Sequence, residues 1–153
     1  MPNTFSQIYI QIVFAVKGRE NLIHKDWKDE LYKYITGICT EHDQKLLAIN
    51  GVSDHIHILI GLKPSMSLSD LVKIIKSNSS RFINERKWIK GKFNWQQGYG
   101  AFSYAHSQLN AVIAYIENQE IHHYKKTFKE EYIDFLVKYH ITYNENYLFE
   151  WIS

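Results

Sequence analysis

The sequence predicts a single α+β domain in which helices flank a four-stranded antiparallel sheet. The chain has 153 residues, the usual size of one domain, and 45% of them are hydrophobic against 22% charged. Along the chain, segments with a period of two alternate with segments of helical spacing. With only two prolines and seven glycines, no linker divides residues 1–153, so we expect one domain with one core.

The first strand is expected over residues 5–16, because apolar side chains occupy alternate positions there. The core-facing positions are Ile8, Ile10, Ile12, Phe14 and Val16. A helix over residues 25–42 follows, since apolar residues recur every three or four positions. These positions are Trp27, Leu31, Tyr34, Ile35 and Ile38.

Residues 45–50 and 55–62 are predicted to form a β-hairpin, because residues 51–54 between them have the composition of a turn. Ser67, with Asp70 three residues later, is typical of the start of a helix. The apolar stripe of this second helix consists of Leu68, Leu71, Val72, Ile75 and Phe82.

A fourth strand is expected over residues 97–105, and a third helix is expected to begin after a Ser107 cap and to end at His122 and His123. Its core face consists of Leu109, Val112, Ile113 and Ile116. Thr127 and Glu130 have the spacing of a capping box and predict a short fourth helix. The inward residues of that helix are Tyr132, Phe135, Leu136 and Tyr139.

This order of elements matches the split βαβ, ferredoxin-like arrangement with an added C-terminal helical extension. In that arrangement the helices cover one face of the sheet. The other face is therefore expected to be open to a ligand or a partner.

Positive charge is concentrated in residues 63–92, although the net charge of the chain is only +2. Basic side chains beside aromatic rings suit a groove for single-stranded nucleic acid, because cations bind phosphates and rings stack on bases. The candidate DNA contacts are Lys73, Lys76, Arg81, Arg86, Lys90, Trp88 and Trp95. Charge alone is also consistent with a solvated helix face that binds nothing.

The sequence predicts a cytoplasmic protein without a membrane segment. No apolar run is long enough to span a bilayer, and the start Met1-Pro2-Asn3-Thr4 lacks the plan of a signal peptide. The single cysteine, Cys39, cannot form an intramolecular disulfide, which fits a reducing compartment.

Two histidines alternate with isoleucines in Asp54-His55-Ile56-His57-Ile58. With a period of two, His55 and His57 share the face opposite the core. Their Cα atoms are then about 6.5–7 Å apart, which is close enough for both imidazoles to bind one cation. Asp54 is either a turn residue or a hydrogen-bond partner of a histidine. The alternative is that both histidines line a solvated sheet face, and the His-x-His pattern alone does not exclude it.

Tyr115 lies about 110° from the apolar face of the third predicted helix, and Gln119 and His122 share its stripe. A tyrosine one turn from an amide oxygen can act as a nucleophile beside a metal ligand. It can also simply cover the flank of a helix, and the spacing does not choose between these roles.

Three segments together resemble the single-tyrosine HUH transposases, small insertion-sequence enzymes that move single-stranded DNA. The segments are Asp54-His55-Ile56-His57-Ile58-Leu59-Ile60, Trp95-Gln96-Gln97-Gly98-Tyr99-Gly100-Ala101-Phe102-Ser103, and Tyr115-Ile116-Glu117-Asn118-Gln119 with His122-His123. The resemblance runs from Gln7 to about Tyr147 and includes Lys76-Ser77-Asn78-Ser79-Ser80.

The resemblance implies that His55 and His57 bind Mg²⁺ or Mn²⁺, that Gln119 completes the metal site and that Tyr115 attacks DNA. It also implies a 5′-phosphotyrosine intermediate, a free 3′-OH and rejoining without an external energy source. The expected substrate is single-stranded DNA that folds into hairpins at element ends. Since imidazoles are softer ligands than Mg²⁺ prefers, Mn²⁺ is expected to bind more tightly.

A homodimer is also expected, because each chain has one nucleophilic tyrosine while a mobile element has two ends to be cut. The resemblance implies active sites shared in trans, with His55 and His57 of one chain facing Tyr115 of the other. The resemblance also allows a cis form during the reaction cycle of some relatives.

The residues by themselves leave two other functions open. A metal-dependent phosphohydrolase could use the same histidines with an activated water, and it would turn over without a covalent adduct. A non-catalytic ferredoxin-like nucleic-acid-binding protein would bind DNA without cleaving it.

Overall fold

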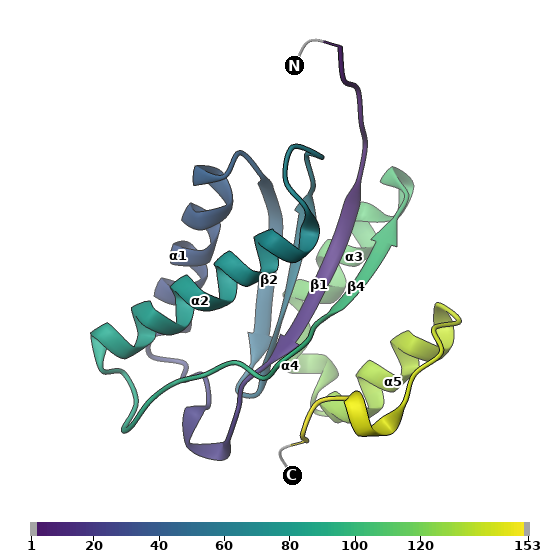
Figure 1. Cartoon of the computed structure of the whole chain (residues 1–153). Coiled ribbons are helices and arrows are strands. Elements are labelled where there is room, and N and C mark those ends of the chain that lie inside the picture. The colour runs from purple at the N-terminus through teal and green to yellow at the C-terminus, as the bar shows by residue number, and fades with distance from the viewer. Residues whose placement is uncertain (1–2, 152–153) are drawn as a thin grey trace.

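The computed structural model describes residues 3–151 and contains a four-stranded antiparallel sheet with the strand order β2-β3-β1-β4 (Figure 1). The strands are β1 (Tyr9–Ala15), β2 (Lys45–Val52), β3 (His55–Gly61) and β4 (Gly100–Tyr104). The α-helices are α1 (Lys28–Glu41), α2 (Leu68–Arg86), α3 (Leu109–Glu117), α4 (Gln119–His122) and α5 (Phe128–Lys138). Short 3₁₀ helices lie at Arg19–Asn21, His106–Gln108 and Glu145–Tyr147. This α+β arrangement confirms the predicted fold class.

Helices α1 and α2 cover one face of the sheet, as the split βαβ arrangement requires (Figure 1). The fully buried side chains of β1 and β3 on this face are Ile12, Phe14, Ile56, Ile58 and Ile60. They belong to one core with Leu31 and Ile35 of α1 and with Leu71 and Ile75 of α2. The period of two in the strands thus selects the core face, as predicted from the sequence.

The second face of the sheet is not open, and here the prediction that helices cover one face was wrong. Helix α3 packs against β2 and β3, where Val112 and Ile116 form a small core with Leu59. Helix α5 covers the other half, and the ring of Phe135 stacks on Phe102 of β4 at 4.9 Å between ring centroids. The apolar stripes of the C-terminal helices must be buried, and this face provides the apolar surface that buries them.

The predicted third helix is broken in two. α3 ends at Glu117, and Asn118, with φ −100° and ψ 23°, separates it from α4. The side chain of Asn50 on β2 donates a hydrogen bond to the Glu117 carbonyl at 3.0 Å, which satisfies an oxygen freed at the helix end. Ser107 does not cap α3, because it lies inside the preceding 3₁₀ helix.

Other local predictions agree closely with the structure. The Ser67 hydroxyl accepts a hydrogen bond from the Asp70 amide at the start of α2, and Thr127 and Glu130 form the predicted capping box of α5. Strand β2 continues to Val52, two residues beyond the expected hairpin strand. Among residues 3–151, no helix combines the length and the apolar character that crossing a bilayer requires.

Candidate active site

His55 and His57 project from β3 toward α4 and α5, and both side chains are fully buried. Each ring is held through its Nδ1 atom. His55 Nδ1 lies 2.8 Å from a carboxylate oxygen of Asp54. His57 Nδ1 lies 2.6 Å from Oε1 of Gln11, whose own amide nitrogen donates to the Tyr104 hydroxyl at 2.7 Å. Asp54 therefore partners a histidine, one of its two predicted roles.

These contacts assign the tautomers of the two rings. A carboxylate oxygen and an amide oxygen can only accept hydrogen bonds, so Nδ1 donates in both His55 and His57. In a neutral imidazole the other nitrogen, Nε2, then carries a lone pair. When both rings are neutral, the two Nε2 atoms therefore present lone pairs to the space between β3 and α5.

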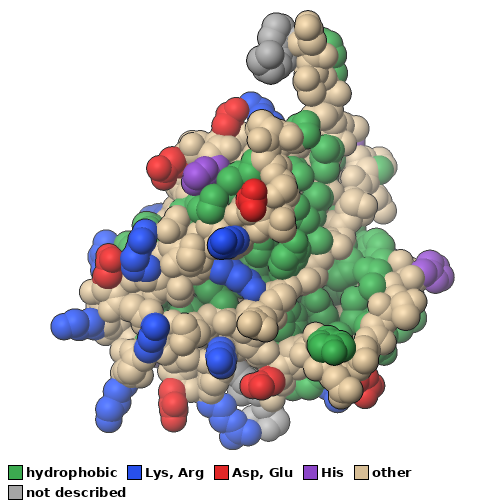
Figure 2. Space-filling model, in the orientation of Figure 1, with side chains coloured by type: hydrophobic (Ala, Val, Ile, Leu, Met, Phe, Trp, Pro, Cys, Tyr) green, Lys and Arg blue, Asp and Glu red, His purple; other side chains and the backbone are tan. Residues whose placement is uncertain are grey.

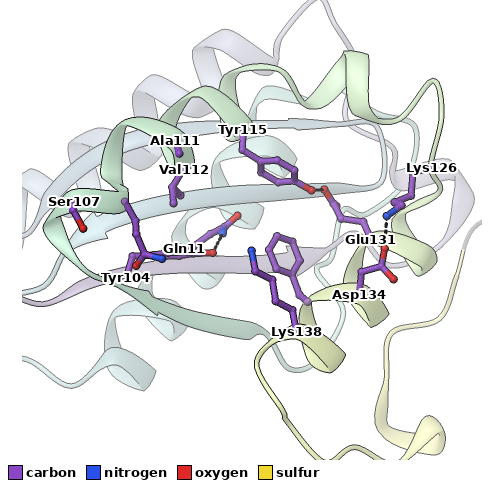
Figure 3. A pocket seen from close by; sticks show the side chains of 12 residues that line it. Gln11, Tyr104, Ser107, Ala111, Val112, Tyr115, Lys126, Glu131, Asp134 and Lys138 are labelled. Carbon is purple, nitrogen blue, oxygen red and sulfur yellow. Dashed lines mark hydrogen bonds and ion pairs between the residues drawn. The ribbon is translucent and has the colours of Figure 1, made fainter.

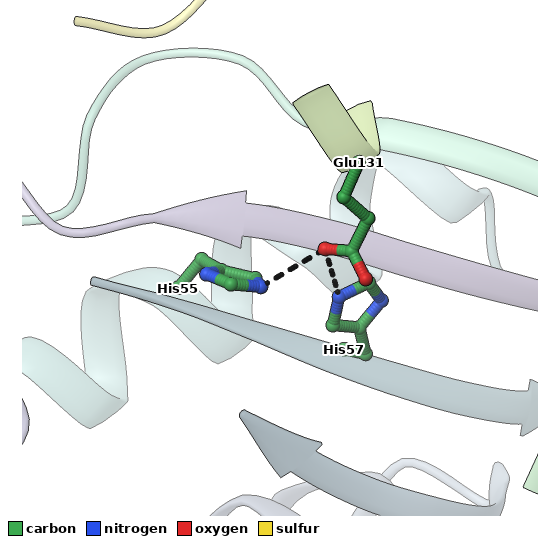
Figure 4. A group of neighbouring side chains, drawn as sticks. All are labelled: His55, His57 and Glu131. Carbon is green, nitrogen blue, oxygen red and sulfur yellow. Dashed lines mark hydrogen bonds and ion pairs between the residues drawn. The ribbon is translucent and has the colours of Figure 1, made fainter. Parts of the chain in front are cut away.

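Glu131 of α5 faces these lone pairs, and it was not among the residues predicted from the sequence (Figure 4). Its Oε1 atom lies 3.2 Å from Nε2 of His55 and 3.1 Å from Nε2 of His57. The Glu131 side chain is only 3% exposed, so protein groups are its main partners. One donor atom from each of the three residues lies within 4.8 Å of the other two.

The sequence did contain a signal for Glu131. It lies three residues after Phe128 and four before Phe135, so helical spacing places a carboxylate on the apolar stripe of its helix. A charged residue on a buried stripe needs a partner, which makes it a candidate ligand. What the spacing could not show is which strand would lie beneath it.

Gln119 and His123 complete the cluster, on α4 and directly after it. Gln119 is fully buried, and its Oε1 lies 3.3 Å from Nε2 of His55 and 3.2 Å from Nε2 of His123. Its amide nitrogen donates to Oε2 of Glu131 at 3.1 Å. The break at Asn118 turns α4 so that Gln119 points inward, although the sequence placed it on a polar stripe.

Tyr115 of α3 reaches the same cluster from its own chain. Its hydroxyl donates a hydrogen bond to Oε2 of Glu131, and its ring stacks on His122 with 4.4 Å between centroids. The Tyr115 and His57 rings are 6.0 Å apart at their centroids. A single chain therefore brings together the predicted nucleophile and all three predicted metal ligands.

The pKa values in the cluster follow from burial and from Glu131. Burial opposes the imidazolium form of both histidines. At His55 the carboxylates of Asp54 and Glu131 outweigh burial and raise the pKa, whereas at His57 burial prevails and lowers it. Burial and the neighbouring Glu131 raise the pKa of Tyr115, which favours the protonated phenol. Burial alone would raise the pKa of Glu131, but the histidines around it hold that pKa well below its usual range.

A cavity of about 550 Å³ opens between α3 and α5, and Tyr115 and Glu131 lie at one end of it (Figure 3). Lys126 and Lys138 line the same cavity. The hydroxyl of Tyr115 is thus reached from outside through a space large enough for part of a ligand.

Most of the predicted DNA contacts lie on the other face of the molecule. Figure 2 shows Lys and Arg side chains gathered over α2 and the loop that follows it, on the face that α1 and α2 cover. Of the predicted set, Lys73, Arg81, Arg86 and Lys90 are exposed there. Arg86 pairs with Glu30 of α1 at 3.0 Å, and its guanidinium lies over the Phe82 ring.

Three of the predicted contacts also make structural contacts within the fold. Trp95 is 9% exposed, packs edge-on against Phe14 and donates its indole hydrogen to the Ser79 hydroxyl at 2.9 Å, so no base can stack on it. The Trp88 ring is half-buried and stacks on Trp27 with 4.9 Å between centroids. Lys76 is half-buried.

The Lys76 ammonium donates to the carbonyls of Gln96 and Gly98 and lies over the Phe14 ring.

The partial burial of Lys76 lowers its pKa from 10.5 to about 8. Between pH 8 and 10.5 the unfolded chain therefore holds a proton that the folded protein has released. In this range the stability of the native protein should rise with pH relative to Lys76→Met. Urea unfolding of both proteins at several pH values measures this, and a constant difference would contradict it.

Comparison with known proteins gives the family. Residues 4–119 match the family described as Transposase IS200 like. The ISDra2 transposase TnpA of Deinococcus radiodurans is 22% identical over 120 residues, which cover 74% of this chain and 84% of the relative. The transposase for insertion sequence element IS200 of Salmonella typhimurium is 28% identical over 94 residues, which cover 58% of this chain and 61% of the relative.

Solved structures share the fold. A crystal structure of a candidate transposase from Deinococcus radiodurans R1 has a TM-score of 0.60 and 23% identity, and the match covers 76% of this chain and 94% of the other. A REP-associated tyrosine transposase bound to a REP hairpin has a TM-score of 0.59 and 14% identity, and the match covers 76% of this chain and 68% of the other. Since the family match spans most of the sequence and includes both histidines, Tyr115 and Gln119, this chain belongs to the IS200-like transposase family.

Proposed function

We propose that this transposase cleaves and rejoins single-stranded DNA, with the Tyr115 hydroxyl as the nucleophile and a divalent ion at His55 and His57. One observation carries the proposal: the Tyr115 hydroxyl and the two histidine Nε2 atoms converge on the same buried carboxylate, at the end of an accessible cavity. A tyrosine that only covered a helix flank would not need such neighbours.

The residues of the cluster fit a divalent cation. The Nε2 lone pairs of His55 and His57 and the Oε1 atoms of Gln119 and Glu131 all point to one region. Acceptor atoms that face each other in a buried space repel unless a cation or a proton lies between them. Mn²⁺ or Mg²⁺ suits this mixture of nitrogen and oxygen donors, and the imidazoles favour Mn²⁺. When bound, the ion would polarise the scissile phosphate and stabilise negative charge on its oxygens.

The proposed reaction exchanges one phosphodiester for another. The Tyr115 oxygen forms a bond to phosphorus, and the bond from phosphorus to the 3′ oxygen breaks. The phenol loses its proton, and the departing 3′ oxygen gains one. The product is a 5′-phosphotyrosine with a free 3′-OH, and because no water is consumed, another 3′-OH can reverse the step.

The proposed substrate is single-stranded DNA that folds into a hairpin. A structural relative was solved with a REP hairpin. In the cavity beside Tyr115, Lys126 pairs with Asp134, so Lys138 is the lining cation that we propose for the phosphate backbone. We also propose the exposed cations Lys73, Arg81, Arg86 and Lys90 as phosphate contacts on the opposite face, with the edge of Trp88 beside them.

The test is detection of the covalent adduct. A 5′- and 3′-labelled hairpin oligonucleotide with Mn²⁺ should give a protein–DNA band on a denaturing gel, and Tyr115→Phe should remove it while leaving DNA binding intact. Tyr124→Phe is a matched control, because Tyr124 is 91% exposed. Cleavage without any adduct would instead indicate a phosphohydrolase, and binding without cleavage would indicate a non-catalytic protein.

We propose a homodimer whose sites are assembled in cis, rather than in trans as the resemblance implied. The need for two tyrosines supports the dimer, and the contact between Tyr115 and Glu131 within one chain supports the cis site. A mixture of His57→Ala and Tyr115→Phe chains should therefore remain inactive in strand cleavage. Recovered cleavage in the mixture would show that the sites are shared in trans.

A further inference from the structure

We propose that Glu131 links the metal ion to the nucleophile: its Oε1 atom is a metal ligand beside His55 and His57, while its Oε2 atom holds the Tyr115 hydroxyl. Glu131 lies on α5, outside residues 4–119, the part of the chain that matches the family. The inference rests on the proposed function, because it assumes that Tyr115 is the nucleophile.

The two oxygens of the carboxylate have different partners. Oε1 faces nitrogen atoms, with Nε2 of His55, His57 and His123 all 3.1–3.2 Å away. Oε2 faces hydrogen-bond donors, the Tyr115 hydroxyl and the Gln119 amide nitrogen. A carboxylate with one oxygen saturated by donors and the other turned to imidazole nitrogens, which bind a metal ion in their neutral form, has the arrangement of a monodentate metal ligand whose second oxygen orients a neighbour.

The surroundings hold Glu131 in this position. Its helix is fixed by the Thr127–Glu130 capping box at its start and by the burial of Phe128 and Tyr132 on either side of the carboxylate. The Phe128 ring also stacks on His55 with 3.8 Å between centroids. The same face of α5 therefore packs against His55 and presents the Glu131 carboxylate to it. This packing would fix the position of the carboxylate relative to both the ion and Tyr115.

A different role would give the opposite result in a binding experiment. If Glu131 only neutralised the histidines and had to leave before an ion could bind, its removal would relieve competition and tighten metal binding. If Glu131 is a ligand, its removal weakens metal binding. The sign of the change therefore decides between the two roles.

The experiment is calorimetric titration of the full chain with Mn²⁺, without DNA. Glu131→Gln should weaken Mn²⁺ binding by about tenfold or more. Glu130→Gln is the matched control, because it makes the same charge change one residue away on an exposed side chain, and glutamine also serves in a capping box. Unchanged or tighter binding by Glu131→Gln would overturn the proposal. The absorption spectrum of bound Co²⁺, which reports its coordination, should change in Glu131→Gln and not in Glu130→Gln, and an unaltered spectrum would also overturn it.

A double-mutant cycle tests the link to Tyr115. The hydrogen bond from the tyrosine withdraws negative charge from the carboxylate, so Tyr115→Phe should tighten Mn²⁺ binding, and this effect should vanish in the Glu131→Gln background. An equal effect in both backgrounds would overturn the link. A failure of this inference is distinguishable from a failure of the proposed function: an adduct formed by the native protein would uphold Tyr115 as nucleophile even if Glu131→Gln bound Mn²⁺ normally.

Discussion

Replacement of His57 by alanine is expected to lower Mn²⁺-dependent cleavage of single-stranded DNA at least about 100-fold. The substitution removes an Nε2 atom that lies 3.1 Å from Glu131, and with it one of the two nitrogen ligands proposed for the ion. It also removes a fully buried ring, so the free energy of unfolding should fall by about 3 kcal/mol. Gel assays of cleavage and urea unfolding in the presence of a chelator measure the two effects separately.

His106→Ala provides the control for this substitution, because His106 is exposed and lies outside the site. It should leave the cleavage rate unchanged. Its effect on the free energy of unfolding should stay within about 0.5 kcal/mol, as is usual for surface substitutions. Metal-dependent cleavage by His57→Ala at the native rate would mean that the ion binds elsewhere. Removal of the metal with a chelator should reproduce the loss of cleavage in the native protein without unfolding it.

Replacement of Gly51 by alanine should be the most destabilising small substitution in the hairpin that carries the histidines. An added Cβ atom would lie 2.2 Å from the His55 carbonyl oxygen and 2.8 Å from the Ile56 Cα atom. Both are backbone atoms of the paired strand, so no side-chain rotation can relieve the clash, and β2 and β3 must separate. We expect a loss of about 3 kcal/mol, together with weaker Mn²⁺ binding because His55 is displaced.

Gly37→Ala is the matched control, with an expected change of opposite sign. Gly37 lies inside α1, and an added Cβ atom would meet nothing within 4 Å. Because alanine restricts the unfolded chain and favours the helix, this variant should be more stable by about 0.5–1 kcal/mol. Guanidinium unfolding of both variants tests the pair, and equal effects in the two would contradict the packing argument.

The elements of the fold that were predicted correctly depend on neighbours in the sequence. The caps at Ser67 and Thr127 need only the residue three positions later. The break of the third helix at Asn118 was missed, because the carbonyl that it frees is satisfied by Asn50 from a distant strand. The apolar stripes of the C-terminal helices were recognised, but their spacing did not indicate that they would cover the second sheet face.

The basic residues of 63–92 show the same limit of prediction from the sequence. Composition identified the exposed cations around α2 but could not separate them from Lys76, a lysine held against the core, and it did not show that the Trp95 ring is buried. The burial of these two side chains depends on which loop packs against α2 in the folded protein. The loop that carries Trp95 lies against α2, where its Gln96 carbonyl accepts a hydrogen bond from Lys76 and its Trp95 indole donates one to Ser79.

The sequence by itself determined that His55 and His57 share one face of a strand, since a period of two follows from the geometry of an extended chain. Through resemblance to a family, it also predicted Tyr115 as the nucleophile and Gln119 as a metal ligand. Only the tertiary structure decided what these residues face. His57 and Glu131 are 74 residues apart in the sequence, and no local pattern relates them. They meet because α5 packs on the second face of the sheet, and the burial of apolar surface that drives this packing also places a carboxylate on the histidines and the tyrosine.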